Sequence, residues 1–290
     1  MERKQKILKH INKNGQGLEI APSYNPIAPK REGYRVHIVD RLSREQLREK
    51  CRSLASRSDS TFSLSYQMGK IEQVDFIWGG GSFRELTGRQ KFYDWIIASH
   101  QVRPVPDLIG FLNDCGEIMK DDAVISLVIA DKRFCLDRLR PVSGTTKIID
   151  AHFGEGKSHS LCSSTDYCLS TDALEGITKA GAGQFLDVHS WCFTPHSFRL
   201  MIHDLYCLGL IPFREVESFP TEGGEFFITL SRNGKGLTES RPELLSKIES
   251  EFSEMPLRRL EPVAKVSVMA SLLNYLKRRL HPYEMRRRAA

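Results

Sequence analysis

The chain has 290 residues, of which 40% are hydrophobic, and a formal net charge of +6. This apolar content is enough for a sizeable buried core, so we expect a folded protein with one large domain or two small ones. No run of about 18 apolar residues that could cross a bilayer is present, and the N-terminal stretch lacks the apolar segment of a secretory signal. We therefore expect a cytoplasmic protein.

The excess positive charge is concentrated at the C-terminus. Residues 277–290 carry six basic side chains and one acidic one, a net of +5. The rest of the chain is nearly neutral and shows no basic surface interleaved with aromatic residues, so we expect no nucleic-acid partner.

Seven cysteines are scattered along the chain without a CxxC pair, which fits reduced thiols better than a disulfide framework. His152, His159, Cys162 and Cys168 are of residue types that bind zinc, but their spacings match no common zinc finger or ribbon. We interpret them as loop residues and expect no metal site.

Strand and helix patterns alternate over the first half of the sequence. Short apolar runs bounded by turn residues predict strands, and apolar residues at helical spacing predict helices. The predicted strands are 17–22, 34–40, 71–78, 93–100 and 122–131, and the predicted helices are 43–55 and 107–119. This alternation predicts an α/β fold with a doubly wound, mostly parallel sheet covered by helices on both faces.

Residues 132–190 interrupt the pattern and are rich in small and polar residues, so we expect an insertion over the ligand-bearing edge of the sheet. A helix is predicted at 194–210, with Thr194 as its N-cap and Pro195 at its first position. Two strands follow at 211–219 and 225–232. The short PTEGG segment between them predicts an antiparallel hairpin.

The remaining residues, 233–290, are expected to form a helical, basic extension of a domain at 1–232. Helices are predicted at 242–252 and 265–280, and the second has one apolar face followed by the basic run. That face would dock on the domain or on a second subunit in a homodimer, the reading we favour. The alternatives are an anionic membrane surface, which would make the protein membrane-peripheral, or a glycosyltransferase partner.

The terminal hairpin separates two kinds of doubly wound domain. A nicotinamide-binding domain would continue to add parallel strands through crossover helices. A sheet that ends in helix, strand, tight turn and strand is the plan of class I S-adenosylmethionine-dependent methyltransferases. This comparison is a fold analogy, so particular residues have to support it.

Five stretches support the comparison: LEIAPSYNP (18–26), IVDR (38–41), ASHQVRPVPD (98–107), ADKRFCLD (130–137) and VHSWCFTPHSF (188–198). They resemble a methyltransferase family, related to the type 11 group, that is associated with bacterial glycosyltransferases and surface-polysaccharide loci. Members of that family read approximately LEIGPGYNP, VD, ASHVIEHVPD and PDKRYCFD in the first four places. The resemblance covers residues 15 to 232. It implies S-adenosylmethionine as the cofactor and a sugar or glycan-linked methyl acceptor.

The resemblance also implies a set of cofactor-binding residues. Ala21 and Ser23 stand where the family has glycines, which let the backbone pass close to the methionine part of the cofactor. Glu19 corresponds to an acid that orients the amino acid end of the cofactor. The other implied residues are Asp40 for the ribose hydroxyls, Asp75 for the adenine amino group, and Ser99 beside the cofactor. Each acid has an alternative role as a cap or an ion-pair partner.

Our candidate catalytic residues are His100, Asp131 and His189. His100 has a side chain suited to general-base chemistry, and its alternative is a structural role. Further candidates are His152 and the pair Lys132 and Arg133, which would meet an anionic acceptor. The family's Glu-His pair is missing, because Arg103 and Pro104 stand in its place.

Two hypotheses follow from these residues. The first is an S-adenosylmethionine-dependent methyltransferase acting on a sugar or glycan-linked acceptor, favoured by Glu19, Asp40 and Asp75. The second is a catalytically inactive binding or scaffold module of the same fold in glycan assembly. The loss of both glycines and of the Glu-His pair favours the second.

Overall fold

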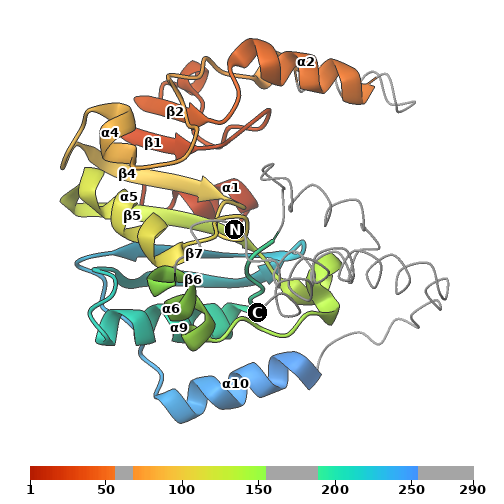
Figure 1. Cartoon of the computed structure of the whole chain (residues 1–290), viewed down its shortest axis with the longest axis vertical. Coiled ribbons are helices and arrows are strands. Elements are labelled where there is room, and N and C mark those ends of the chain that lie inside the picture. The colour runs from red at the N-terminus through yellow and green to blue at the C-terminus, as the bar shows by residue number, and fades with distance from the viewer. Residues whose placement is uncertain (56–67, 155–188, 254–290) are drawn as a thin grey trace, which may run out of the picture.

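The computed structural model describes residues 1–55, 68–154 and 189–253. Within these ranges the chain forms a seven-stranded sheet in the order β3-β2-β1-β4-β5-β7-β6 (Figure 1). The parallel strands are β1 (Gly17–Ile20), β2 (Val36–Asp40), β3 (Phe76–Ile77), β4 (Tyr93–Ser99) and β5 (Met119–Ala130). The last two strands, β6 (Arg214–Glu222) and β7 (Glu225–Ser231), form an antiparallel hairpin that joins the sheet through β7. The predicted α/β fold, a doubly wound and mostly parallel sheet that ends in an antiparallel hairpin, is confirmed.

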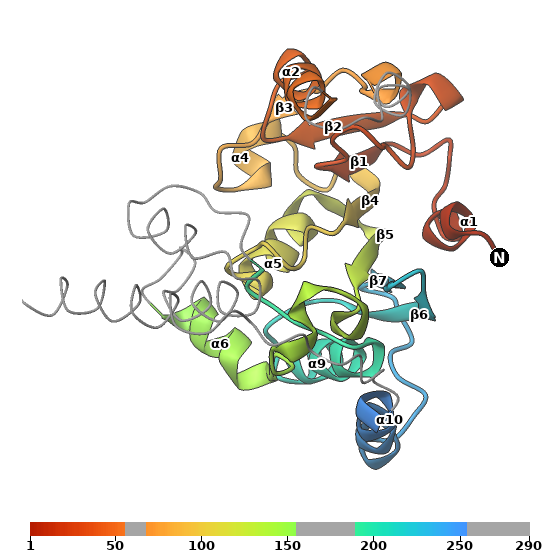
Figure 2. The ribbon, with the colours of Figure 1, turned by 90° about the vertical axis from the view of Figure 1, so that its right-hand side faces the viewer.

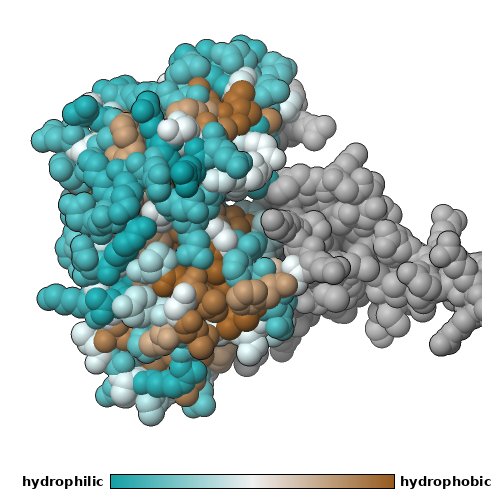
Figure 3. Space-filling view, turned by 60° about the vertical axis from the view of Figure 1, so that its left-hand side comes forward, coloured by the Kyte–Doolittle hydropathy of each residue, from teal (hydrophilic) through white to brown (hydrophobic). Residues whose placement is uncertain are grey.

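Helices cover both faces of the sheet (Figure 2). On one face, α5 (Leu108–Ile118) and α9 (Pro195–Cys207) pack on the largest hydrophobic core, near the shorter helices α4 (Phe83–Thr87) and α6 (Thr145–Phe153). On the other face lie α1 (Arg3–Leu8) and α2 (Arg44–Ala55), which bury the alternate strand side chains in two smaller clusters. Seen from outside, hydrophobic side chains gather in the lower half of the face shown in Figure 3, beside the grey atoms.

Ion pairs fasten α1 and its C-terminal end to the β6–β7 hairpin. Lys6 pairs with Glu222, Lys9 with Glu217 and Arg3 with Glu225. Ile7 is buried in the same contact, and its carbonyl accepts a hydrogen bond from Ser126 Oγ on β5 at 2.8 Å. The N-terminal helix is therefore part of the folded domain, held by charge as well as by apolar packing.

The predicted helix ends are close to the observed ones. Thr194 is the N-cap of α9 and Pro195 its first residue, as predicted. Asp107 caps α5 by accepting a hydrogen bond from the Gly110 backbone N–H at 2.8 Å. At the start of α2, Gln46 and Ser43 exchange hydrogen bonds in a capping box.

The predicted strand bounds are less accurate. The predicted strand 71–78 is wrong in extent, because only Phe76–Ile77 pairs with β2 while Ile71 and Val74 pack in the cluster under α2. Strand β5 begins at Met119, three residues early, because Met119 already pairs with Tyr93. Strand β6 begins three residues late, because Ile211 and Phe213 enter the core before the ladder starts.

Short 3-10 turns lie in the connections that follow β1 and β5. One, Lys30–Glu32, follows the loop after β1, and another, Lys132–Phe134, follows β5. A third, Leu136–Leu139, comes soon after it. The last two turns, together with α6, fill the part of the predicted insertion up to residue 154. The rest of that insertion, at 155–188, lies outside the described residues.

The predicted C-terminal helix 242–252 is confirmed as α10 (Arg241–Ser253). It packs against α9, and its Leu244 is fully buried. The predicted helix 265–280, the basic run that follows it, and the docking, homodimer and membrane predictions based on them concern residues outside the described ranges. The proposed division at residue 232 stays a prediction.

Candidate cofactor site

The loop after β1 has an unusual backbone. Ala21 and Ser23 have φ angles of +49° and +53°, in the left-handed region that glycine adopts most easily. The loop is held in place because the Ala21 N–H donates to the Val39 carbonyl on β2 at 2.6 Å. The two places where the resembled family has glycine thus keep a backbone conformation suited to glycine, although each carries a side chain.

Glu19 lies on β1 and is 1% exposed. Its two carboxylate oxygens accept hydrogen bonds from the backbone N–H groups of Ile27 at 2.6 Å and Ala28 at 3.1 Å. Burial raises the pKa of Glu19 to about 7, although these two donors lower it. In this arrangement Glu19 ties the far end of the loop back to the strand, and its predicted contact with the cofactor stays a prediction.

Asp40 is the last residue of β2, next to β1 in the sheet. Its Oδ2 accepts from the Ser23 N–H at 3.1 Å, and its Oδ1 accepts from the Arg41 N–H at 2.7 Å. Burial raises the pKa of this carboxyl group above its ordinary value. The structure thus brings Asp40 and the loop after β1 together, through a bond between Asp40 and Ser23.

Asp75 lies apart from these residues, one position before β3 begins. Its carboxylate pairs with Lys30 at 2.6 Å and accepts from the Ile38 N–H at 2.7 Å. In the register of β2 and β3, Asp75 is at the level of Ile38, whereas Asp40 pairs with Ile77. The residue that follows β3 at the carboxyl end is Trp78, whose ring is contacted by the Arg41 guanidinium at 5.4 Å.

Ser99 and His100 lie at the carboxyl end of β4. Ser99 is the last residue of the strand and pairs with Val128. His100 has a φ of +58°, a side chain that is 46% exposed, and an Nε2 atom 2.9 Å from Glu225 Oε2. Glu225 also accepts from Arg3, and these two partners outweigh burial and lower its pKa to about 2.

Sequence reasoning missed Glu225 and Arg3. Glu225 is 125 residues away from His100 in the chain, and the two meet because β7 runs antiparallel and starts beside the end of β5. The predicted hairpin was the only signal that could have located Glu225 at this edge.

Asp131 follows β5 and is fully buried. Its carboxylate pairs with Arg133 at 2.7 Å and accepts from Thr221 Oγ1 at 2.6 Å. Asp131, a predicted catalytic residue, and Arg133, predicted with Lys132 to meet an anionic acceptor, are thus engaged with each other. Together with Thr221 they fasten the strand end to the hairpin.

His189 lies in a second buried network. Its Nδ1 is 2.8 Å from Asp137 Oδ2, and its Nε2 is 3.1 Å from Nη2 of Arg103. Asp137 also pairs with Arg140 at 2.9 Å, and its hydrogen-bonding and charged partners lower its pKa to about 2 despite burial. Sequence reasoning did not predict a role for Asp137 or Arg140, and it recorded Arg103 only as a departure from the resembled family.

The other candidates are placed as follows. His152 on α6 lies 3.0 Å from Asp107, the cap of α5. Lys132 is 3% exposed and donates to the Arg138 carbonyl at 3.0 Å. Within the described ranges no group of three or more His, Cys, Asp or Glu side chains is arranged to hold a metal, and no helix there is long and apolar enough to cross a membrane.

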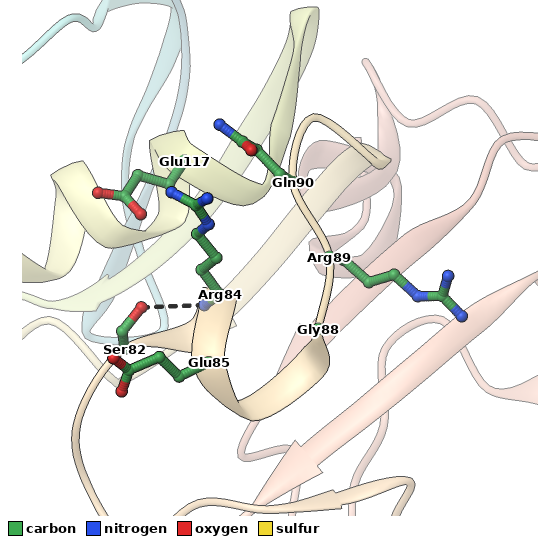
Figure 4. A pocket seen from close by; sticks show the side chains of 7 residues that line it. All are labelled: Ser82, Arg84, Glu85, Gly88, Arg89, Gln90 and Glu117. Carbon is green, nitrogen blue, oxygen red and sulfur yellow. Dashed lines mark hydrogen bonds between the residues drawn. The ribbon is translucent and has the colours of Figure 1, made fainter.

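One open groove of about 710 Å³ lies at the other edge of the sheet. It is lined by α4, the segment before β4 and the end of α5, with Arg84, Glu85 and Glu117 among its side chains (Figure 4). Since β4 begins at Tyr93, just after this segment, the groove is at the amino end of the strand. It is therefore separate from the loop after β1 and from His100, which lie at the carboxyl ends.

No protein-family model matches the chain, and no curated protein matches it. Solved structures do match. Mitomycin 7-O-methyltransferase is 11% identical, with 79% of this chain and 52% of that chain covered and a TM-score of 0.39, so this chain spans about half of that protein. A SAM-dependent methyltransferase from Aquifex aeolicus is 10% identical, with coverages of 79% and 88% and a TM-score of 0.36.

A third match is a protein from Rhodobacter sphaeroides provisionally described as a Zn-dependent alcohol dehydrogenase. It is 9% identical, with coverages of 80% and 89% and a TM-score of 0.45. At such identities and scores, the activity of this chain has to be inferred from the residues at its own site.

Proposed function

We propose that this chain is an S-adenosylmethionine-dependent methyltransferase that acts on a sugar or glycan-linked acceptor. The observation that carries the proposal is the left-handed backbone at Ala21 and Ser23, linked to the Asp40 carboxylate at the end of the next strand. Non-glycine residues in this conformation are strained, and such strain concentrates at functional sites. The acceptor class comes from the sequence resemblance.

The residues present fit the cofactor. Asp40 uses one bond on Oδ2, and a carboxylate oxygen can accept more than one hydrogen bond, so it retains capacity for ribose hydroxyls. Ala21 adds only a methyl group to the loop, and Ser23 adds a hydroxyl that can itself donate. When bound, S-adenosylmethionine supplies an electrophilic methyl group. The loop after β1 and Asp40 would hold it at the carboxyl edge of the sheet.

We assign to His100 the removal of a proton from an acceptor hydroxyl, because its side chain is partly exposed at the carboxyl end of β4 and contacts Glu225. Because the ionised Glu225 faces Nε2, we assign the ring proton to Nε2, which leaves the lone pair of Nδ1 free to accept a proton. Glu225 then stabilises the imidazolium that forms. Alignment of the acceptor hydroxyl with the methyl group is the other contribution of the protein.

The second candidate is the inactive binding module. It is favoured by the side chains at positions 21 and 23 and by Arg103, whose charge is opposite to that of the family's glutamate. The two candidates differ in one measurable property, the binding of the cofactor.

Calorimetric titration with S-adenosylmethionine and S-adenosylhomocysteine tests the proposal. We expect micromolar binding, weakened about 5- to 150-fold in Asp40→Ala, because a charged partner lost from a buried site costs about 1–3 kcal/mol. Asp121→Ala is the matched control, since that carboxylate is 69% exposed near the amino end of β5. Absence of binding at millimolar concentrations would refute the methyltransferase proposal and favour the scaffold.

A further inference from the structure

A buried group of charged side chains lies beyond the carboxyl ends of β4 and β5. We call it the basic cluster and define it as Arg103, Lys132, Asp137 and Arg140. Their exposed fractions are 8%, 3%, 0% and 5%. Three of the four are cations and one is a carboxylate, so the cluster holds more positive than negative charge.

The single carboxylate is shared by both guanidinium groups. Asp137 accepts from Nη1 of Arg103 at 2.8 Å and from Nη1 of Arg140 at 2.9 Å. Within the described part of the chain, no other carboxylate pairs with these arginines and none pairs with Lys132. Lys132 donates to the Arg138 carbonyl and lies 5.7 Å from the Phe252 ring centre. The neighbouring Asp131 is matched by its own cation, Arg133.

Two buried donors in the cluster lack an acceptor. The Nε atoms of Arg103 and Arg140 are inaccessible to solvent and have no hydrogen-bond partner among the residues that the structure describes. A buried donor without a partner is destabilising, and so is a buried cation without a counter-charge. A negatively charged group with several oxygens would correct both, because guanidinium groups bind carboxylate and phosphate with directed hydrogen bonds.

The cluster lies where an acceptor is expected. Arg103 is three residues beyond His100, and Lys132 and Arg140 follow β5. Strand β4 lies between β1 and β5, so the loop after β1, His100 and the basic cluster follow one another along the same edge of the sheet. The cluster reaches solvent at His189, whose side chain is 19% exposed and contacts both Arg103 and Asp137.

We propose that the basic cluster binds an oxyanion, namely a carboxylate or phosphate group carried by the methyl acceptor. The binding of an oxyanion stands on the cluster alone, whereas the assignment of that oxyanion to the acceptor rests on the proposed function. The acceptor is accordingly an acidic or phosphorylated sugar, and its anionic group lies beyond β5 while its hydroxyl meets His100.

The first test is titration of the full chain with inorganic phosphate at constant ionic strength, followed by calorimetry and by thermal unfolding. We expect millimolar binding and a rise in the unfolding midpoint with phosphate. Lys132→Met should weaken phosphate binding about tenfold or more, since it removes a buried cation. The unfolding midpoint of Lys132→Met without phosphate is measured as well, because Lys132 also donates to the Arg138 carbonyl, and this separates a loss of phosphate binding from a loss of stability.

Arg89→Met is the matched control, because Arg89 is a cation in the groove at the opposite edge of the sheet. It should leave phosphate binding unchanged. The proposal is overturned if the wild type does not bind phosphate. It is also overturned if Arg89→Met loses phosphate binding while Lys132→Met keeps it.

A second arm identifies the source of the anion. Glucuronate and a hexose phosphate are compared with glucose and with inorganic phosphate. Tighter binding of the charged sugars than of phosphate supports an acidic acceptor, and equal affinity assigns the cluster to free phosphate and overturns the acceptor role. S-adenosylhomocysteine is titrated on the same samples. A protein that does not bind it lacks the proposed function, and this result is distinct from a failure to bind the anion.

Discussion

Replacing Ser23 by glycine should stabilise the protein, which is the reverse of the usual effect of such a substitution. Ser23 has a φ of +53°, and an L-residue in the left-handed region costs about 1–2 kcal/mol relative to its preferred conformations. Glycine has no such penalty, but it costs about 0.5–1 kcal/mol in extra chain entropy of the unfolded state. The net expected gain is about 0.5 kcal/mol, with the Ser23 N–H still donating to Asp40.

A second serine-to-glycine variant serves as a control, because it has the same cost in unfolded-chain entropy as Ser23→Gly. Ser99→Gly, at the end of β4, changes the same side chain at a position outside the left-handed region, and it should destabilise by about 0.5–1 kcal/mol. The two variants should therefore differ by about 1–2 kcal/mol in the free energy of unfolding. Ala21→Gly and Ala28→Gly form a second pair, in which Ala28 also loses a fully buried methyl group.

Urea unfolding monitored by circular dichroism measures these differences, and cofactor titration on the same variants asks whether a glycine loop binds more tightly. Equal destabilisation in Ser23→Gly and Ser99→Gly would refute the inference that the loop after β1 keeps a glycine-type backbone, and with it the main support for a cofactor site.

Two further predictions concern buried acids. Because the pKa of Glu19 is raised from 4.5 to about 7, the folded state binds the extra proton, so this group stabilises below pH 4.5 and the gain is lost as pH rises through about 7. The expected decrease in the free energy of unfolding over this range is about 3 kcal/mol. Glu19→Gln should remove the pH dependence. A wild-type free energy of unfolding that does not change between pH 4.5 and 7 would contradict this prediction. Glu225→Gln should convert His100 from a single Nε2-protonated tautomer to a mixture, read from the ring ¹⁵N shifts, and should lower kcat more than it changes KM once an acceptor is known. An unchanged tautomer in that variant would show that Glu225 does not orient the ring.

The succession of strands and helices along the chain was predictable from sequence, because the signals for each element are local. Each parallel strand is a short apolar run followed by a helix with its own start signal, such as Asp107 before α5 or Thr194 and Pro195 before α9. The Gly223–Gly224 turn, with φ angles of +62° and +85°, fixes the hairpin. Strand bounds were less predictable, because Ile71 and Ile211 are apolar yet pack outside the ladder.

In the candidate site, only the residues at or just after the carboxyl ends of strands could be predicted from sequence. Asp40 and the loop after β1 meet because β1 and β2 are neighbours, and the family resemblance had implied that these residues share one site. The partners of His189 and His100 could not be predicted, since Asp137 and Glu225 reach them through packing between segments distant in the chain. A sequence pattern gives the residue types at a strand end, but the pairing of charges depends on tertiary contacts.

The antiparallel direction of β7 determines where insertions in the sequence can reach the candidate site. Because β7 is antiparallel, the turn that precedes it lies at the same edge as the ends of β4 and β5, where Gly224 accepts from the Asp131 N–H and Glu225 contacts His100. A turn between two antiparallel strands tolerates insertions without altering the register of the sheet. Residues added between Glu222 and Glu225 would lie beside His100 and Asp131, so the surroundings of these two side chains can be altered at this turn without moving a strand.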